Sequence, residues 1–111
     1  MLSFRFLSGA LVGFPHLEAV LLEYNQLASI EAETFMLAAG ELGSFVGLRH
    51  NAIGRLAPGA IAGEGLTYVY LDNNALTRLE AGSIVVGSNS SVFAANNGIE
   101  TVEPGAIVGK N

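Results

Sequence analysis

Few side chains in this sequence could do chemistry, and their spacing brings none of them together. His16 and His50 are far apart, and neither has a second histidine or a carboxylate cluster at the spacing of a metal site. The serines lie outside a Gly-x-Ser-x-Gly motif, and no Gly-x-Gly-x-x-Gly or P-loop sequence occurs. We therefore expect no catalytic residues, no metal site and no cofactor, which argues against an enzyme.

The remaining polar motifs are interpreted as surface features. The glutamates at positions 31, 33, 100 and 103 fall where we expect solvated loops. No other residues accompany them at a spacing that would support a catalytic role. Asn89-Ser90-Ser91 is a formal glycosylation sequon, but the position of Asn89 is apolar and inward in another unit of a sequence repeat in this chain. Modification of Asn89 is left open.

Composition excludes several classes of partner. The chain of 111 residues has no cysteine, which removes disulfides, thiol catalysis and thiolate metal sites. Its net charge is −5, and its few basic residues are scattered, so we expect no binding to nucleic acid. Hydrophobic residues make up 50% of the chain, yet no stretch approaches the roughly 20 apolar residues of a membrane span.

The elements that must position any site follow from a repeated asparagine. It occurs at Asn25, Asn51, Asn74 and Asn97, at spacings of 26, 23 and 23 residues, and each copy has apolar residues at the same offsets. The third unit is the clearest and contains Leu66, Val69, Leu71, Leu76, Leu79 and Ile84. Self-similarity at this period predicts a solenoid.

The local pattern divides each unit into a strand and a return path. Residues 67–72 alternate inward and outward, which predicts a short strand. Beyond the asparagine the alternation stops and Gly and Pro cluster, as in Ala57-Pro58-Gly59, so we expect loops, turns or short 3₁₀ segments. Stacked strands would pair in parallel. The side-chain amide of each asparagine would bridge backbone groups left unpaired at the turn.

These units resemble the leucine-rich repeat family, in its typical subclass of about 24 residues common in extracellular proteins. The resemblance implies an α/β horseshoe with a parallel sheet on its concave face and mostly irregular or 3₁₀ segments on its convex side. The domain would be residues 1–111, with a partial unit at 1–16 and full units at about 17–42, 43–65, 66–88 and 89–111. The first full unit has an insertion near Leu37–Glu41. In the fourth, Asn89 and Ala94 replace leucines, so its core should be loose.

The start of the chain has two interpretations. Residues 1–14 resemble a short signal peptide with Arg5 as the only positive charge. Alternatively, Gly9-Ala-Leu-Val-Gly13 matches Gly59–Gly63 and Gly105–Gly109 in residue type, which favours the tail of an earlier repeat. We also expect adjoining repeats or caps of the same chain, because terminal repeats need capping, and expect the isolated segment to be poorly soluble or to associate end to end.

The repeat also predicts which side chains face outward, because side chains alternate along a strand. Aromatic residues would cluster there, and such patches mark interaction sites, although aromatics also pair well across strands for structural reasons alone. These predicted partner-binding aromatics are Phe45, Tyr68, Tyr70 and Phe93. A neighbouring charged row, Glu23, Arg49 and Asp72, alternates in sign and is interpreted mainly as a surface ion ladder, with Arg49 and Asp72 at the edge of the predicted site.

The sequence thus favours a non-enzymatic module that recognises an unidentified protein ligand through the concave face. The alternative is a structural spacer within a larger receptor, adhesion protein or enzyme. An extracellular or membrane-tethered location is implied by the resemblance, and a cytoplasmic one stays open.

Overall fold

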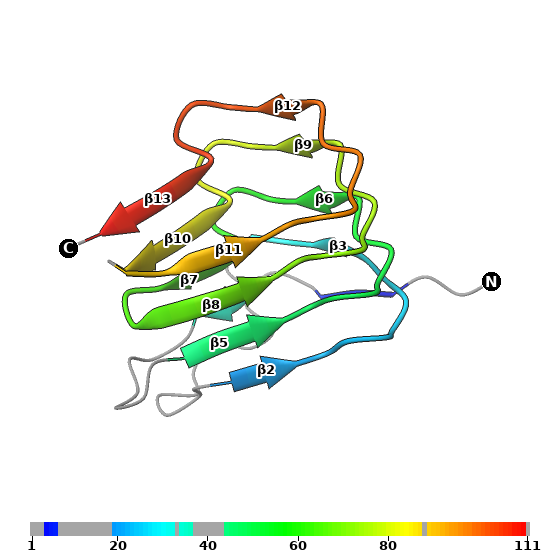
Figure 1. The fold of residues 1–111 in the computed structure, drawn as a ribbon, viewed down its shortest axis with the longest axis horizontal. Helices are drawn as coiled ribbons and strands as arrows, with labels where there is room; N and C mark the ends of the chain where they lie inside the picture. Colours follow the sequence, from blue (N-terminus) through cyan, green and yellow to red (C-terminus); the bar gives the residue numbers. More distant parts are fainter. Residues whose placement is uncertain (1–3, 7–18, 33, 37–43, 88, 111) are drawn as a thin grey trace.

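The chain folds into a solenoid of parallel β-strands (Figure 1). The computed structural model describes residues 4–6, 19–32, 34–36, 44–87 and 89–110. Several sequence predictions lie outside these residues: the repeat-like element at 9–13, the signal-peptide alternative, His16 and the insertion at 37–41. The predicted repeat architecture is confirmed, since strands of successive units pair in parallel over four turns.

The first strand of each turn belongs to a four-stranded sheet, called here the aromatic sheet. Its strands are β2 (Ala19–Leu21), β5 (Ser44–Gly47), β8 (Leu66–Tyr70) and β11 (Ser91–Phe93). The predicted strand at 67–72 is therefore confirmed, displaced by one or two residues. A bulge at the start of the β5–β8 pair sets Ser44 opposite Leu66 and Phe45 opposite Tyr68.

The prediction of an α/β fold with an irregular convex side is wrong. Within the described ranges there is no helix, and the return path of each turn carries two more short strands. The second strands are β3 (Leu27–Ile30), β6 (Arg55–Leu56), β9 (Arg78–Leu79) and β12 (Thr101–Val102), with β1 (Phe4–Phe6) paired to β3. The third strands are β4 (Phe35–Met36), β7 (Ile61–Gly63), β10 (Ile84–Gly87) and β13 (Ile107–Lys110).

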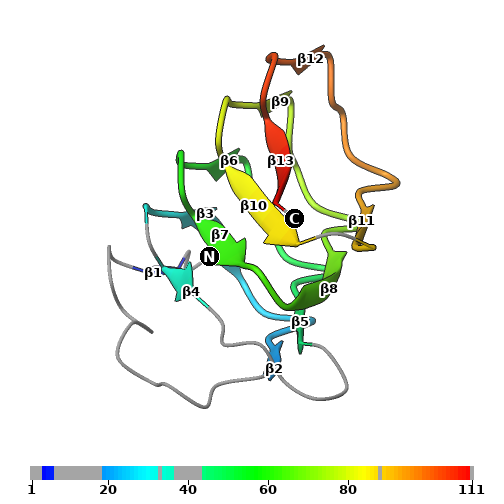
Figure 2. The ribbon, with the colours of Figure 1, turned by 90° about the vertical axis from the view of Figure 1, so that its left-hand side faces the viewer.

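The return path forms short strands because its turns follow one another closely. Glycines with left-handed φ, Gly59, Gly82 and Gly105, make a turn eight residues after the asparagines of their units. An average helix needs about 11–12 residues, which do not fit between an asparagine and the glycine eight residues after it. Extended segments fit, and their backbone groups are satisfied by the same segment one turn away. Figure 2 shows the strands of each sheet stacked in order along the solenoid.

The repeated apolar residues of the units form the core between the sheets. Residues at equivalent positions of neighbouring turns are buried in one core cluster, for example Val46 and Val69, Leu48 and Leu71, and Ile61 and Ile84. The fourth unit is less covered, as its sequence predicted: Val92, Ala94 and Ile99 are only partly buried, and Val102 is exposed.

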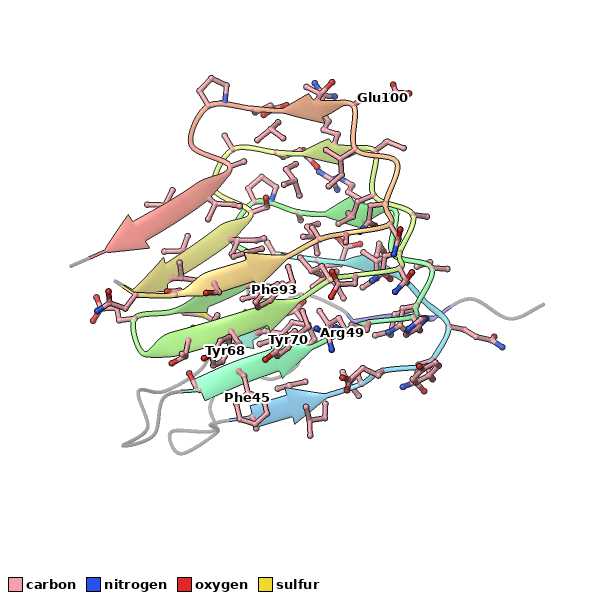
Figure 3. The ribbon with its side chains drawn as sticks, in the orientation of Figure 1. Phe45, Arg49, Tyr68, Tyr70, Phe93 and Glu100 are labelled. Carbon is pink, nitrogen blue, oxygen red and sulfur yellow. The ribbon has the colours of Figure 1, made fainter. Side chains whose placement is uncertain are left out.

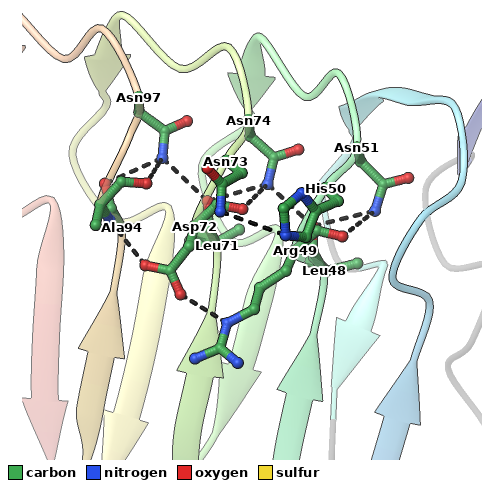
Figure 4. A network of polar contacts seen from close by, with 11 residues as sticks. Leu48, Arg49, His50, Asn51, Leu71, Asp72, Asn73, Asn74, Ala94 and Asn97 are labelled. Carbon is green, nitrogen blue, oxygen red and sulfur yellow. Dashed lines mark hydrogen bonds and ion pairs between the residues drawn. The ribbon is translucent and has the colours of Figure 1, made fainter.

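Asn51, Asn74 and Asn97 of the predicted asparagine ladder bridge backbone groups, and their geometry repeats in the last three turns (Figure 4). Asn74 Oδ1 accepts a hydrogen bond from the amide of Ile53 at 3.1 Å, and its Nδ2 donates to the carbonyls of Leu48 at 2.9 Å and Leu71 at 3.0 Å. Asn51 and Asn97 make the equivalent contacts one turn down and one turn up. Each amide thus joins its own turn to the preceding one.

Asn25 differs from the other three. It is exposed, and its Nδ2 donates to the carbonyls of Leu22 and Glu23 in its own turn. The residue before each asparagine, by contrast, is equivalent in all four turns. Its backbone is left-handed, with φ of 58° at Tyr24, 58° at His50, 60° at Asn73 and 57° at Asn96. This left-handed residue turns the chain immediately before each asparagine.

Candidate binding face

The predicted outward rows of the aromatic sheet are confirmed by its register. Phe45 lies opposite Ala19 and Tyr68, and Tyr70 lies opposite Gly47 and Phe93. The four predicted aromatic side chains therefore project from three adjacent strands onto one surface, with Arg49 beside them (Figure 3). Phe45, Tyr68 and Phe93 have 37%, 42% and 41% of their surface exposed.

Three of these rings are nearly parallel to one another. Tyr70 and Phe93 have ring centroids 5.3 Å apart and planes inclined by 8°. Tyr68 lies 5.8 Å from Tyr70 and 6.4 Å from Phe93, with interplanar angles of 16° and 21°. Parallel rings on a pleated sheet are the expected result of in-register cross-strand pairing. They make a row of rings on the outside of the solenoid, and we call the surface formed by Phe45, Tyr68, Tyr70 and Phe93 the aromatic face.

Arg49 and Asp72 form the polar border of the aromatic face. The guanidinium carbon of Arg49 lies 4.2 Å from the centroid of the Tyr70 ring, a cation–π contact, and its Nε lies 2.7 Å from Asp72 Oδ2. Partial desolvation opposes ionisation of Asp72. The hydrogen bonds from Arg49 and from the amide of Ala95 outweigh it, so the pKa of Asp72 is lowered from its ordinary value. The Arg49–Asp72 half of the predicted ion ladder is formed.

A pocket of about 310 Å³ opens beside the aromatic rings. Gly47 lies between two of the lining residues, Leu21 on β2 and Tyr70 on β8. A Cβ atom at Gly47 would stand 3.0 Å from the carboxylate oxygens of Glu23, so this carboxylate reaches over the glycine. The pocket lining includes Leu21, Glu23, Phe45, Arg49, Tyr68 and Tyr70.

A second charged row lies on the return path and was not predicted from the sequence. Arg55 Nε is 2.9 Å from Glu80 Oε2, and Arg78 Nε is 3.0 Å from Glu103 Oε2. The hydrogen bond from Arg55 lowers the pKa of Glu80, and Glu80 in turn raises the pKa of Arg55. Glu103, expected to be merely solvated, also accepts a hydrogen bond from the amide of Ala81. These pairs tie neighbouring turns together.

The residues that could do chemistry stay apart where the structure describes them. His50 stacks on Tyr24, with ring centroids 4.4 Å apart and an interplanar angle of 6°, at the left-handed corner of the ladder. The hydroxyls of Ser83 and Ser90 donate to the nearby carbonyls of Glu80 and Gly87. Across the described ranges, no group of three or more His, Asp or Glu side chains could hold a metal ion.

Asn89 of the sequon does not occupy the inward position expected from the frame. It is exposed and has a left-handed φ of 61° in the turn before β11. Its equivalent in the third unit, Leu66, is buried at the start of β8. Since the fourth unit enters its strand two residues later than the third, Asn89 lies in the turn instead of the core.

Comparison of the chain with protein-family models, with curated proteins and with solved structures gave no match. Among the described residues, no helix is long and apolar enough to cross a membrane. The aromatic face and its pocket are therefore the features from which a function can be inferred.

Proposed function

We propose that this chain is a non-enzymatic protein-binding module of the leucine-rich repeat type, which recognises a protein ligand through the aromatic face. The observation that carries the proposal is the contiguity of Phe45, Tyr68, Tyr70 and Phe93 on the outward side of three neighbouring strands. Aromatic side chains left on an outer surface are common at interaction sites, and tyrosine is enriched among residues that dominate binding energy.

The character of the face fits a protein ligand. It combines large apolar rings with a polar border, the Arg49–Asp72 ion pair, which is the usual anatomy of a protein interface. Its strands are held by ladders of backbone and asparagine hydrogen bonds, so the rings are presented on rigid elements. Little conformational freedom would be lost on binding, which favours affinity.

The alternative is that the repeats only space other domains and the rings only stabilise the sheet. A randomised peptide library displayed on phage and selected on the wild-type protein distinguishes the two. We expect enriched peptides that no longer bind after the triple substitution of Tyr68, Tyr70 and Phe93 by alanine. Tyr24→Ala is the matched control, because Tyr24 is an exposed aromatic residue outside this face. Failure to enrich any peptide, or equal binding to the triple variant, would support the spacer.

A further inference from the structure

The residues that surround Gly47 line the pocket on the aromatic face. On the outward side of β5, Gly47 is preceded by Phe45 and followed by Arg49, at two-residue spacing. On either side it is flanked by Leu21 and Tyr70 on the neighbouring strands. These four neighbours all line the pocket, and the carboxylate of Glu23 covers Gly47, 3.0 Å from where a Cβ atom would stand.

Three of the seven residues that line this pocket are aromatic. Phe45, Tyr68 and Tyr70 line it, and the apolar side chain of Leu21 closes the side toward β2. The rings of Tyr68 and Tyr70 are inclined by only 16° to each other and lie 5.8 Å apart between centroids. Aromatic faces carry negative electrostatic potential and attract cations placed over them. Tyr70 already holds the guanidinium of Arg49 in this way, 4.2 Å from its centroid.

The charges at the pocket leave one carboxylate without a partner. Arg49 is neutralised by Asp72, which lies 2.7 Å away and faces it across the strands. Glu23 lies over Gly47, and among the described residues its carboxylate forms no ion pair. Of the two charged residues that line the pocket, Arg49 is paired with Asp72 outside the lining, which leaves the Glu23 carboxylate as the lining charge without an ion-pair partner. The chain as a whole also carries a net charge of −5.

We infer that this pocket takes a basic side chain, lysine or arginine, of a partner protein; the inference rests on the protein-binding function proposed above. The charged head would lie beside the Glu23 carboxylate and against the tyrosine faces, while its methylene stem would pack on Phe45 and Leu21. An acidic side chain would meet the charge of Glu23. A neutral apolar side chain would desolvate that carboxylate with no compensating partner, which is unfavourable.

The test uses three short peptides that differ only at a central residue: lysine, norleucine or glutamate in a Gly-Gly-X-Gly-Gly frame with blocked ends. Binding to the ¹⁵N-labelled protein is followed by the chemical shift of the Gly47 amide. We expect the lysine peptide to bind at least tenfold more tightly than the other two. Equal binding of the norleucine peptide would overturn the inference, because it has the same stem and lacks the charge.

Two substitutions locate the effect. Glu23→Gln keeps the shape of the side chain and removes its charge, and we expect it to weaken binding of the lysine peptide by about tenfold. Gly47→Ala places a Cβ 3.0 Å from the present position of the Glu23 carboxylate and displaces this flexible side chain, and we expect a similar loss with the fold retained. The control is Glu100→Gln, which removes the same charge from an exposed residue on the return path (Figure 3).

The outcomes separate this inference from the function on which it rests. If Glu100→Gln weakens binding as much as Glu23→Gln does, the attraction comes from overall charge and the pocket is not the site. If both pocket variants bind the lysine peptide normally while the triple aromatic variant loses its selected peptides, the face binds protein without this pocket. Loss of the lysine peptide in the pocket variants alone supports the inference.

Discussion

Asn74 Oδ1 accepts a hydrogen bond of 3.1 Å from the amide of Ile53, a residue of the preceding turn. Its Nδ2 also reaches back, to the carbonyl of Leu48. Backbone groups at this corner lie beyond the end of the sheet ladder, so the amide satisfies donors and acceptors that would otherwise be buried without partners. One side chain thereby connects two turns of the solenoid.

Replacement of Asn74 by leucine tests this connection. The substitution keeps the approximate shape but removes the amide, and unsatisfied buried polar groups cost about 1–3 kcal/mol, so we expect the free energy of unfolding to fall by that amount. Asn25→Leu is the matched control. Because Asn25 is exposed and donates only to carbonyls of its own turn, we expect a loss of at most about 1 kcal/mol. Urea denaturation measures both. Equal losses would contradict the role of the connection between turns.

A second prediction concerns the corner glycine Gly82. Its φ of 73° lies in the left-handed region, and a Cβ added there would meet no atom within 4 Å. Gly82→Ala should therefore destabilise through backbone strain alone, by about 1–2 kcal/mol. Gly54→Ala is the control, since Gly54 has no such φ and a Cβ there would lie 3.9 Å from its nearest neighbour. Thermal melts showing the same midpoint for Gly82→Ala and wild type would refute the assignment of this corner.

The carboxylates of Asp72 and Glu80 predict a dependence of stability on pH. Both have a pKa lowered from the ordinary value, Asp72 despite desolvation and Glu80 mainly through its hydrogen bond with Arg55. A depressed folded-state pKa gives stability that is present above the unfolded-state pKa and is lost as the pH falls through the folded-state value. We therefore expect the free energy of unfolding to decline below about pH 4, the ordinary range of these groups.

The variant Asp72→Asn/Glu80→Gln should show a smaller decline over the same pH range, because its two neutral side chains have no charge to lose. The arginine of each pair is 40% or 57% exposed, so solvent screens the interaction and each pair contributes only about 0–1 kcal/mol. Urea unfolding at pH 7 and at pH 3 provides the comparison. A variant with the same pH dependence as wild type would show that other carboxylates are responsible.

The sequence predicted those features that repeat at one spacing. Asn51, Asn74 and Asn97 set the frame, and spacing alone placed Tyr70 opposite Phe93 and Val46 on Val69. Parallel pairing explains this success: in a solenoid, residues one period apart become neighbours. The core and the aromatic face follow from that single relation.

Strands too short to show an alternating pattern were not predicted. Strands such as Arg55–Leu56 and Arg78–Leu79 have two residues each, too few to show a pattern of their own. The ion pairs of the return path were missed because they join residues 25 apart and not 23, as in Arg55 and Glu80. Arg78 and Glu103 have the same offset, so a search for charges at that spacing would have found both pairs.

The pocket at Gly47 was missed for a different reason. The sequence placed this glycine correctly in an outward row but gave no sign of which side chain would cover it. Only the structure places the carboxylate of Glu23 over it, 3.0 Å from the position of a Cβ atom. Side-chain direction depends on the neighbours of three strands at once, and a repeat frame alone does not supply it.

The most direct test of the proposed function is the dissociation constant of one peptide selected on the wild-type protein. It should be measured with wild type, with Tyr24→Ala and with the triple alanine variant of Tyr68, Tyr70 and Phe93, each checked for cooperative unfolding. We predict that the triple variant stays folded and binds at least tenfold more weakly, while Tyr24→Ala binds as wild type does. A folded triple variant that binds with the wild-type dissociation constant would contradict the assignment of the aromatic face as the binding surface.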